Sequence, residues 1–158
     1  MLALPLGQWA VVVLASGVLA AVLMNIPMYV QPEGYRPAYV AAAGATRRDP
    51  GEVGPAAAAV AHHVAGVAAA VLYGGLTFAL AAVLPTLLPL NGVPAVPHLV
   101  GVLAVTLFVY AFFERVALPR AGGSFREDAD PIVRQWALSA FIYGVTLALV
   151  VPVLVTQL

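Results

Sequence analysis

The side chains best suited to proton transfer or metal binding near neutral pH are the three histidines, His62, His63 and His98. His62 and His63 are sequence neighbours, so on a helix their rings point about 100° apart and do not converge on one ligand. Helical metal sites favour ligands three or four residues apart, and no histidine here has a His, Asp or Glu at that spacing. We therefore expect no metal site and no bound cofactor.

Asn25 and His62 each interrupt a row of small residues, and the two rows lie on either side of an Arg-containing loop. Each lies on the order of 10 Å from that loop at ~1.5 Å per helical residue, so we expect them to face each other at one level. In a membrane helix such a pair could form a proton-responsive site. Alternatively, it forms an interhelical hydrogen bond of roughly 0.6–1 kcal/mol that sets the packing. His63 would then reach the membrane interface or another helix.

An acidic residue could complete the Asn25/His62 site. Tyr110 and Glu114 are four residues apart, so they share one helix face. Glu114 could join His62 in an acid–imidazole pair of the type used in proton relays. Alternatively, the adjacent Glu114 and Arg115 form an anchor at the membrane surface. Both interpretations place Glu114 at the cytoplasmic boundary.

His98 and Tyr143 are polar residues of the second half of the chain. We expect His98 on the opposite side of the membrane from His62, so a bis-histidine haem site would have to bridge most of the bilayer, unless protomers share it. Tyr143 lies roughly 18 Å into the last predicted helix, where its hydroxyl is expected to hydrogen-bond another helix. Ser139, four residues earlier, shares its face.

Catalytic motifs are absent from the sequence. No GxSxG nucleophile elbow, Walker loop or GxGxxG motif occurs. The chain has no cysteine, which excludes disulfides, thiolate metal sites and thiol redox chemistry. Its formal net charge of zero argues against a nucleic-acid partner. We therefore expect no catalytic residues, and the sequence favours a protein that is not an enzyme.

The elements that position these residues follow from the distribution of charge. All seven Arg and all seven Asp or Glu lie between Glu33 and Glu52 or between Glu114 and Arg134, and 63% of the residues are hydrophobic. Because a bilayer excludes charge, the uncharged stretches predict an all-α, polytopic membrane protein. The whole chain, residues 1–158, is expected to be one four-helix transmembrane domain. Its predicted spans are residues 8–29, 55–84, 98–118 and 131–155, with a proline-rich break at 85–97.

Orientation follows from the arginines. Two crossings separate the Arg-bearing loops, 30–54 and 114–134, so both loops lie on one side, which the positive-inside rule makes the cytoplasm. Both termini are then extracytoplasmic. The first span, which no basic residue precedes, is expected to be a retained helix rather than a signal peptide. Arg without any Lys is typical of a GC-rich prokaryotic genome, so we expect the inner (plasma) membrane.

Aromatic residues mark the expected membrane surfaces. Trp9 and Tyr29 lie at the two ends of the first span, where such side chains favour the interface. Residues 37–45 could form a short interfacial helix, with Tyr35 and Tyr39 at the headgroups. Alternatively, this segment is a poorly ordered loop.

Small residues recur every four positions on two predicted spans. Membrane helices associate through close packing of such residues rather than through hydrophobic burial. The first ridge continues to Asn25, and the second begins at Ala58 and includes His62. We expect the two ridges to pack together through Gly17, Ala21, Gly66, Ala70 and Gly74.

Part of the chain resembles a known family. A Gly- and Ala-rich first helix ends in Met24-Asn25-Ile26-Pro27, and a later segment reads His62-His63-Val-Ala-Gly66, followed by Tyr73-Gly74. Together with the Tyr-Val-Ala-Ala segment between them, these motifs resemble the uncharacterised, YagU-like four-helix membrane proteins of prokaryotes. The resemblance covers residues 17–75. It implies a fold and a membrane location without an activity, and draws attention to His62, His63, Gly66 and Tyr73.

Three functions are consistent with the sequence. The first is a non-enzymatic accessory subunit of a membrane complex, or a homo-oligomeric bundle, whose partners are the lipid bilayer and a second polypeptide or further copies. The second is a small transporter or channel-like protein with Asn25, His62 and Glu114 as a proton-sensitive site. The third is a membrane enzyme acting on lipid through His62 or His63. The Arg47-Arg48 pair would bind its headgroup, or simply neutralise the surface.

Overall fold

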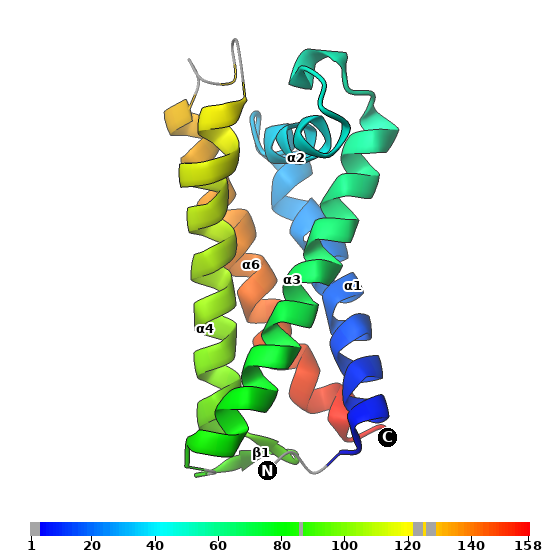
Figure 1. The fold of residues 1–158 in the computed structure, drawn as a ribbon, viewed down its shortest axis with the longest axis vertical. Coiled ribbons are helices and arrows are strands. Elements are labelled where there is room, and N and C mark those ends of the chain that lie inside the picture. Colours follow the sequence, from blue (N-terminus) through cyan, green and yellow to red (C-terminus); the bar gives the residue numbers. More distant parts are fainter. Residues whose placement is uncertain (1–3, 86, 122–124, 126–128) are drawn as a thin grey trace.

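Four helices of the computed structural model are long and apolar enough to cross a membrane (Figure 1). The structure describes residues 4–85, 87–121, 125 and 129–158. The long helices are α1 (Leu6–Val30), α3 (Pro55–Val83), α4 (Ala95–Phe112) and α6 (Ala129–Val155). The shorter elements are α2 (Arg36–Thr46), η1 (Pro50–Glu52), β1 (Pro89–Leu90), β2 (Val93–Pro94), the π-helical turn η2 (Phe113–Ala117) and η3 (Leu118–Arg120). This all-α architecture with four candidate spans is the one that the charge distribution predicts.

The long helices form an elongated bundle in which successive spans run antiparallel (Figure 1). α1 and α4 each pack on both α3 and α6. The end of α4, the start of α6 and α2 lie together, and we call this the Arg-rich end. The opposite end holds β1 and β2, the start of α1 and the end of α6, and we call it the hairpin end. The two Arg-bearing segments therefore flank one end of the bundle.

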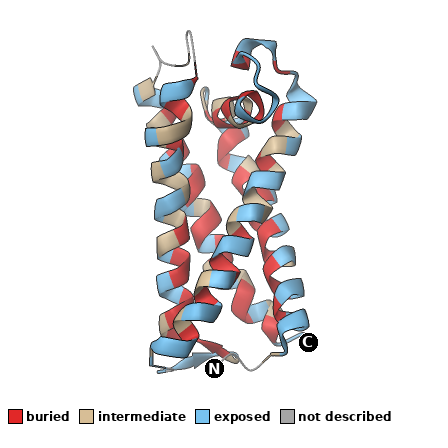
Figure 2. Cartoon of the chain, in the orientation of Figure 1, coloured by how far each residue is buried: buried red, intermediate tan, exposed pale blue. Residues whose placement is uncertain are grey.

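The outer faces of the long helices are apolar. Figure 2 shows buried residues lining the interior and exposed residues along the outside of each helix. The exposed residues include large apolar side chains such as Leu103, Phe141 and Leu149. A helix satisfies its backbone groups internally, so it can present such a surface to hydrocarbon. These faces are the ones expected to contact lipid.

The helices begin and end within a few residues of the predicted spans. α3 begins at Pro55, a position where the missing N–H costs no hydrogen bond. α4 begins at Ala95, three residues earlier than predicted, because Pro97 falls in its first turn, where proline is tolerated. Pro27 and Pro152 lie inside α1 and α6 and terminate neither helix.

The first Arg-bearing loop contains the helix α2, so residues 37–45 are not a poorly ordered loop. α2 lies across the Arg-rich end, where Figure 1 shows it end-on, and it contacts α3 and α6. Its C-cap residue, Arg47, has left-handed backbone with φ of 56°. The Arg48 N–H donates to the Ala43 carbonyl at 3.2 Å, which closes the last turn of the helix. Arg47 and Arg48 are thereby held beside α2.

The break between α3 and α4 contains a β-hairpin that the sequence analysis did not predict. Leu90 pairs with Val93 in an antiparallel register. Asn91 and Gly92 connect the strands with φ of 50° and 86°. A tight turn of this hand needs positive φ at both positions, which is why Asn-Gly is favoured there. The buried side chain of Val93 anchors the turn to the bundle.

The two predicted ridges of small residues do pack together, between α1 and α3. A Cβ added at Gly17 would lie 2.5 Å from the Ala70 Cβ, and one added at Gly66 would lie 2.8 Å from the Ala21 Cβ. A side chain at Gly74 would collide with α1 in the same way. The three glycines therefore set how closely α1 and α3 approach.

Candidate functional site

At the Arg-rich end, Asn25 pairs with His63 and not with His62. The Asn25 Nδ2 lies 3.3 Å from the His63 Nε2, and the His63 Nδ1 lies 2.8 Å from the Ala59 carbonyl oxygen. A carbonyl only accepts, so in the neutral ring Nδ1 donates to Ala59 and Nε2 accepts from Asn25. The predicted Asn25–His62 contact is wrong, although Asn25 does meet the histidine pair.

His62 contacts the backbone of α1 instead. Its Nε2 lies 3.1 Å from the Ala21 carbonyl oxygen, to which it donates, and its side chain is buried. The His62 and His63 rings are 4.9 Å apart and nearly perpendicular, at 82°. A shift of one residue turns a side chain by about 100° around its helix, so His62 faces α1 while His63 reaches round to Asn25.

Glu114 and Tyr110 do not join this cluster. Glu114 lies in η2 with its carboxylate 3.9 Å from the Arg115 Nε. It lines a hollow that also includes Asp130 and Arg134. Tyr110 is half-buried and packs against the core. No hydrogen bond or ion pair among the described residues connects Glu114 with either histidine, so the predicted acid–imidazole pair is not formed.

The hairpin end holds a buried hydrogen-bonded chain that the sequence analysis missed. The Tyr73 hydroxyl lies 2.6 Å from the His98 Nδ1, and the His98 Nε2 lies 3.1 Å from the Ala148 carbonyl oxygen. Since Nε2 donates to the carbonyl, Nδ1 of the neutral ring accepts a hydrogen bond from the Tyr73 hydroxyl. Both side chains are fully buried, and the chain connects α3, α4 and α6. Tyr73 therefore belongs with His98, at the opposite end from His62.

Trp9 completes the polar contacts of the hairpin end. Its Nε1 donates to the Gly74 carbonyl at 3.2 Å, and its ring centroid lies 6.3 Å from that of Tyr73. Only 3% of Trp9 is exposed. Trp9 thus lies near the end of the first span, as predicted, but its ring is buried and its N–H is used inside the bundle.

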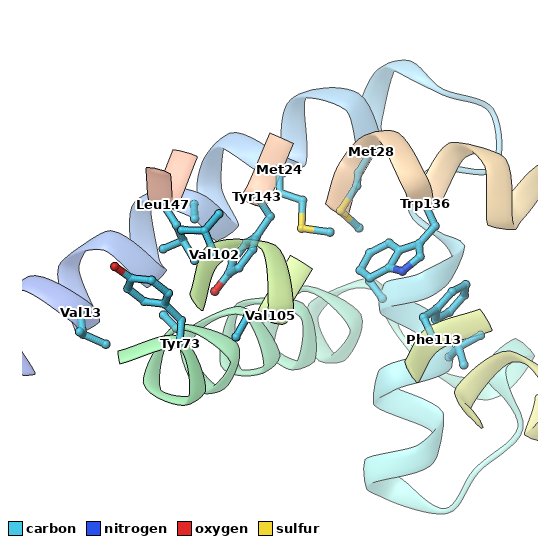
Figure 3. Close-up of a cluster of buried hydrophobic side chains, with 14 of the residues drawn as sticks. Val13, Met24, Met28, Tyr73, Val102, Val105, Phe113, Trp136, Tyr143 and Leu147 are labelled. Carbon is cyan, nitrogen blue, oxygen red and sulfur yellow. The ribbon is translucent and has the colours of Figure 1, made fainter. Parts of the chain in front are cut away.

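Tyr143 connects α6 with α3 in the middle of the bundle. Its hydroxyl donates to the Gly66 carbonyl at 2.6 Å, which is the interhelical hydrogen bond predicted for it. Figure 3 shows Tyr143 between Tyr73 towards one end of the core and Trp136 towards the other. Ser139 is also buried, but it donates within its own helix, to Gln135 at 3.3 Å. Although Ser139 lies on the same helix face as Tyr143, its hydroxyl forms no interhelical hydrogen bond.

Aromatic residues cluster where α1 meets α2. The Tyr29 and Tyr35 rings stack at 4.9 Å, and the Tyr39 ring lies edge-on to Tyr35 at 6.1 Å. Partial burial raises the pKa of Tyr35 above its ordinary value. Tyr29 is 70% exposed, as expected of an interfacial tyrosine. Gln135 joins α6 to this region by accepting from the Glu33 N–H at 2.8 Å.

The chemistry available to these groups is limited by their partners. The described residues include no cluster of three or more His, Asp or Glu that could hold a metal ion. Within the long helices, His62, His98 and Tyr143 each donate a hydrogen bond to a backbone carbonyl of another helix. Such contacts hold helices together. Asn25 differs, because its Oδ1 is buried without a hydrogen-bond partner.

No family model, curated protein or solved structure matches the chain. The YagU-like resemblance of residues 17–75 thus stays a prediction. Function is inferred from the contacts of this chain alone.

Proposed function

We propose that the chain is a non-enzymatic integral membrane protein that works as an accessory subunit or as a homo-oligomeric bundle. The observation that carries this proposal is the use of the intramembrane donors. Trp9, His62, His98 and Tyr143 all lie within hydrogen-bond distance of backbone carbonyls on neighbouring helices. Groups used in this way stabilise a bundle and are not poised to attack a substrate.

The test is native mass spectrometry of the gently solubilised protein. We expect either a second polypeptide at a fixed ratio or a defined homo-oligomer. A strictly monomeric protein with no bound polypeptide would contradict the proposal. The measurement needs no knowledge of a substrate, which makes it the first one to perform.

We propose further that the Arg-rich end faces the cytoplasm of a prokaryotic cell and that the termini lie outside. Support comes from the grouping of α2 with the end of α4 at one end of the bundle, since arginines favour the cytoplasmic side (Figure 1). The chain has no cysteine, so single cysteines report topology cleanly. In intact cells, a membrane-impermeant maleimide should label Leu87→Cys, an exposed position near the hairpin, and spare Arg48→Cys. The reverse pattern would invert the orientation.

A proton-sensitive transporter is the second candidate, and the Asn25–His63 contact favours it. This half-buried pair joins α1 and α3, and the Asn25 Oδ1 is left without a partner. His63→Ala should then retain the fold and lose pH-dependent flux in liposomes, while His62→Ala should lower stability. Unchanged flux in folded His63→Ala protein would exclude this function for the pair.

A further inference from the structure

An apolar cavity of about 340 Å³ lies between α3 and α4, next to α2. Ala65 and Ala69 line it from α3, and Phe108 and Phe112 line it from α4. Small residues on one helix opposite large ones on the other leave a space that neither helix fills. The volume falls within the range of roughly 300–1,000 Å³ that is usual for ligand sites.

One wall of this cavity carries an unsatisfied donor. Trp136 lines the cavity, is 8% exposed, and has a buried Nε1 without a hydrogen-bond partner. Figure 3 shows its indole beside Phe113, at the end of the core away from Tyr73. A buried N–H left unpaired is costly, and the Trp136 Nε1 is covered in the unliganded bundle, so a ligand oxygen would pair with it after a shift of the indole. The fitting ligand is therefore apolar with an oxygen acceptor near one end.

A second hollow, of about 520 Å³, adjoins the cavity at the Arg-rich end. Ala41, Phe112 and Ala117 line both spaces, so the two lie side by side. Arg47, Arg48 and Arg120 line the second hollow.

The charge of this second hollow is unbalanced. None of the described residues that line it is an Asp or Glu, and its three arginines form no ion pair with a described residue. Asp49, next in the chain to Arg48, accepts from the Gly51 N–H at 2.9 Å. The hollow between η2, η3 and α6 differs, because Glu114 and Asp130 accompany Arg134 there. The hollow beside α2 is thus the one suited to an anion.

We propose that an anionic glycerophospholipid occupies these two spaces as a bound ligand. Its acyl chain fills the cavity between α3 and α4, its phosphate lies against Arg47, Arg48 and Arg120, and an ester carbonyl accepts from Trp136. Basic pockets between membrane helices are established sites for anionic headgroups. The order of these features, an apolar cavity, a donor and a cationic hollow, matches the order of acyl chain, ester and phosphate along such a lipid. The proposal holds whether the bundle is an accessory subunit or a transporter.

The headgroup is tested by lipid titration and native mass spectrometry. Phosphatidylglycerol and phosphatidylcholine with identical chains are added separately to delipidated protein. We expect phosphatidylglycerol to be retained at least about tenfold more strongly, and the triple variant Arg47→Gln/Arg48→Gln/Arg120→Gln to lose that preference. The control is Arg115→Gln, which removes a charge at the same end but outside the hollow. Equal retention of the two lipids by the unmodified protein, or an unchanged preference in the triple variant, overturns the proposal.

The acyl-chain site is tested by filling the cavity. Ala69→Leu should abolish lipid retention, whereas Ala79→Leu, on an exposed position of α3, should leave it intact. Circular dichroism and thermal melting establish that both variants are folded. If Ala69→Leu does not fold, Ala65→Leu takes its place. If a folded variant with a filled cavity still retains the lipid, no acyl chain is bound in the cavity. The same conclusion follows if millimolar inorganic phosphate alone displaces the lipid.

Discussion

The two ends of the bundle use histidine differently. At the hairpin end, His98 is fully buried and lies between Tyr73 and the Ala148 carbonyl, so each ring nitrogen has a partner on another helix. At the Arg-rich end, His63 is half-buried and shares one weak contact with Asn25. His62 also cross-links the Arg-rich end, through the Ala21 carbonyl. The hairpin end is closed, whereas the Arg-rich end is open around His63 and has hollows beside α2. This contrast places the stronger polar cross-link at one end and the proposed lipid site at the other.

The largest expected effect comes from breaking the closed end. His98→Leu keeps an apolar side chain of similar size but leaves the Tyr73 hydroxyl and the Ala148 carbonyl without partners. Each buried unpaired group costs about 1–3 kcal/mol, so we expect a loss of roughly 2–3 kcal/mol in the free energy of unfolding. The measurement is denaturant-induced unfolding in detergent.

The matched variant at the open end is His63→Leu. Interhelical hydrogen bonds in membrane proteins average about 0.6 kcal/mol, and the pair with Asn25 is only half-buried, so a loss below about 1 kcal/mol is expected. Equal losses in His98→Leu and His63→Leu would remove the distinction between the two ends.

An effect between those of the two histidine variants is expected where the two ends are joined, along the contact between α1 and α3. Gly66→Ala would place a methyl group 2.8 Å from the Ala21 Cβ, so one helix must move. Overpacking of this kind costs about 1–3 kcal/mol, and we expect the lower half of that range because the glycine-to-alanine change favours the helix. Thermal melting in detergent measures it. Gly75→Ala is the control, since nothing lies within 4 Å of the added methyl. A Gly66→Ala protein as stable as Gly75→Ala would show that the glycine does not set the helix separation.

The difference between the ends also shows what the sequence could predict. The segregation of charge predicts the spans, and the four-residue spacing of small residues predicts the α1–α3 contact. Each of these patterns can be read within a single helix. The Asn25–His63 pair depends on the rotation of α3, where one residue of error turns a side chain by about 100°. The Tyr73–His98 bond depends on the register between α3 and α4. The segment that connects these helices turns at Asn91-Gly92, and this pair favours a tight turn that could have been predicted inside the proline-rich break.

The smallest effect concerns the pH dependence of the open end. Burial raises the pKa of Tyr35, so between its unfolded value near 10 and its folded value the folded chain retains a proton that the unfolded chain has released. Stability must therefore fall as the pH rises above about 10. Tyr35→Phe removes this contribution and keeps the ring that stacks on Tyr29. Near pH 7 the variant should unfold within about 0.5 kcal/mol of the unmodified protein, and above pH 10 it should lose less stability. Melting temperatures of both proteins between pH 8 and 11 in one detergent measure the difference, in which the other tyrosines cancel. Parallel curves would mean that Tyr35 is as free to ionise as an exposed tyrosine, and that the Arg-rich end is more open to water than the stacking of Tyr29 on Tyr35 indicates.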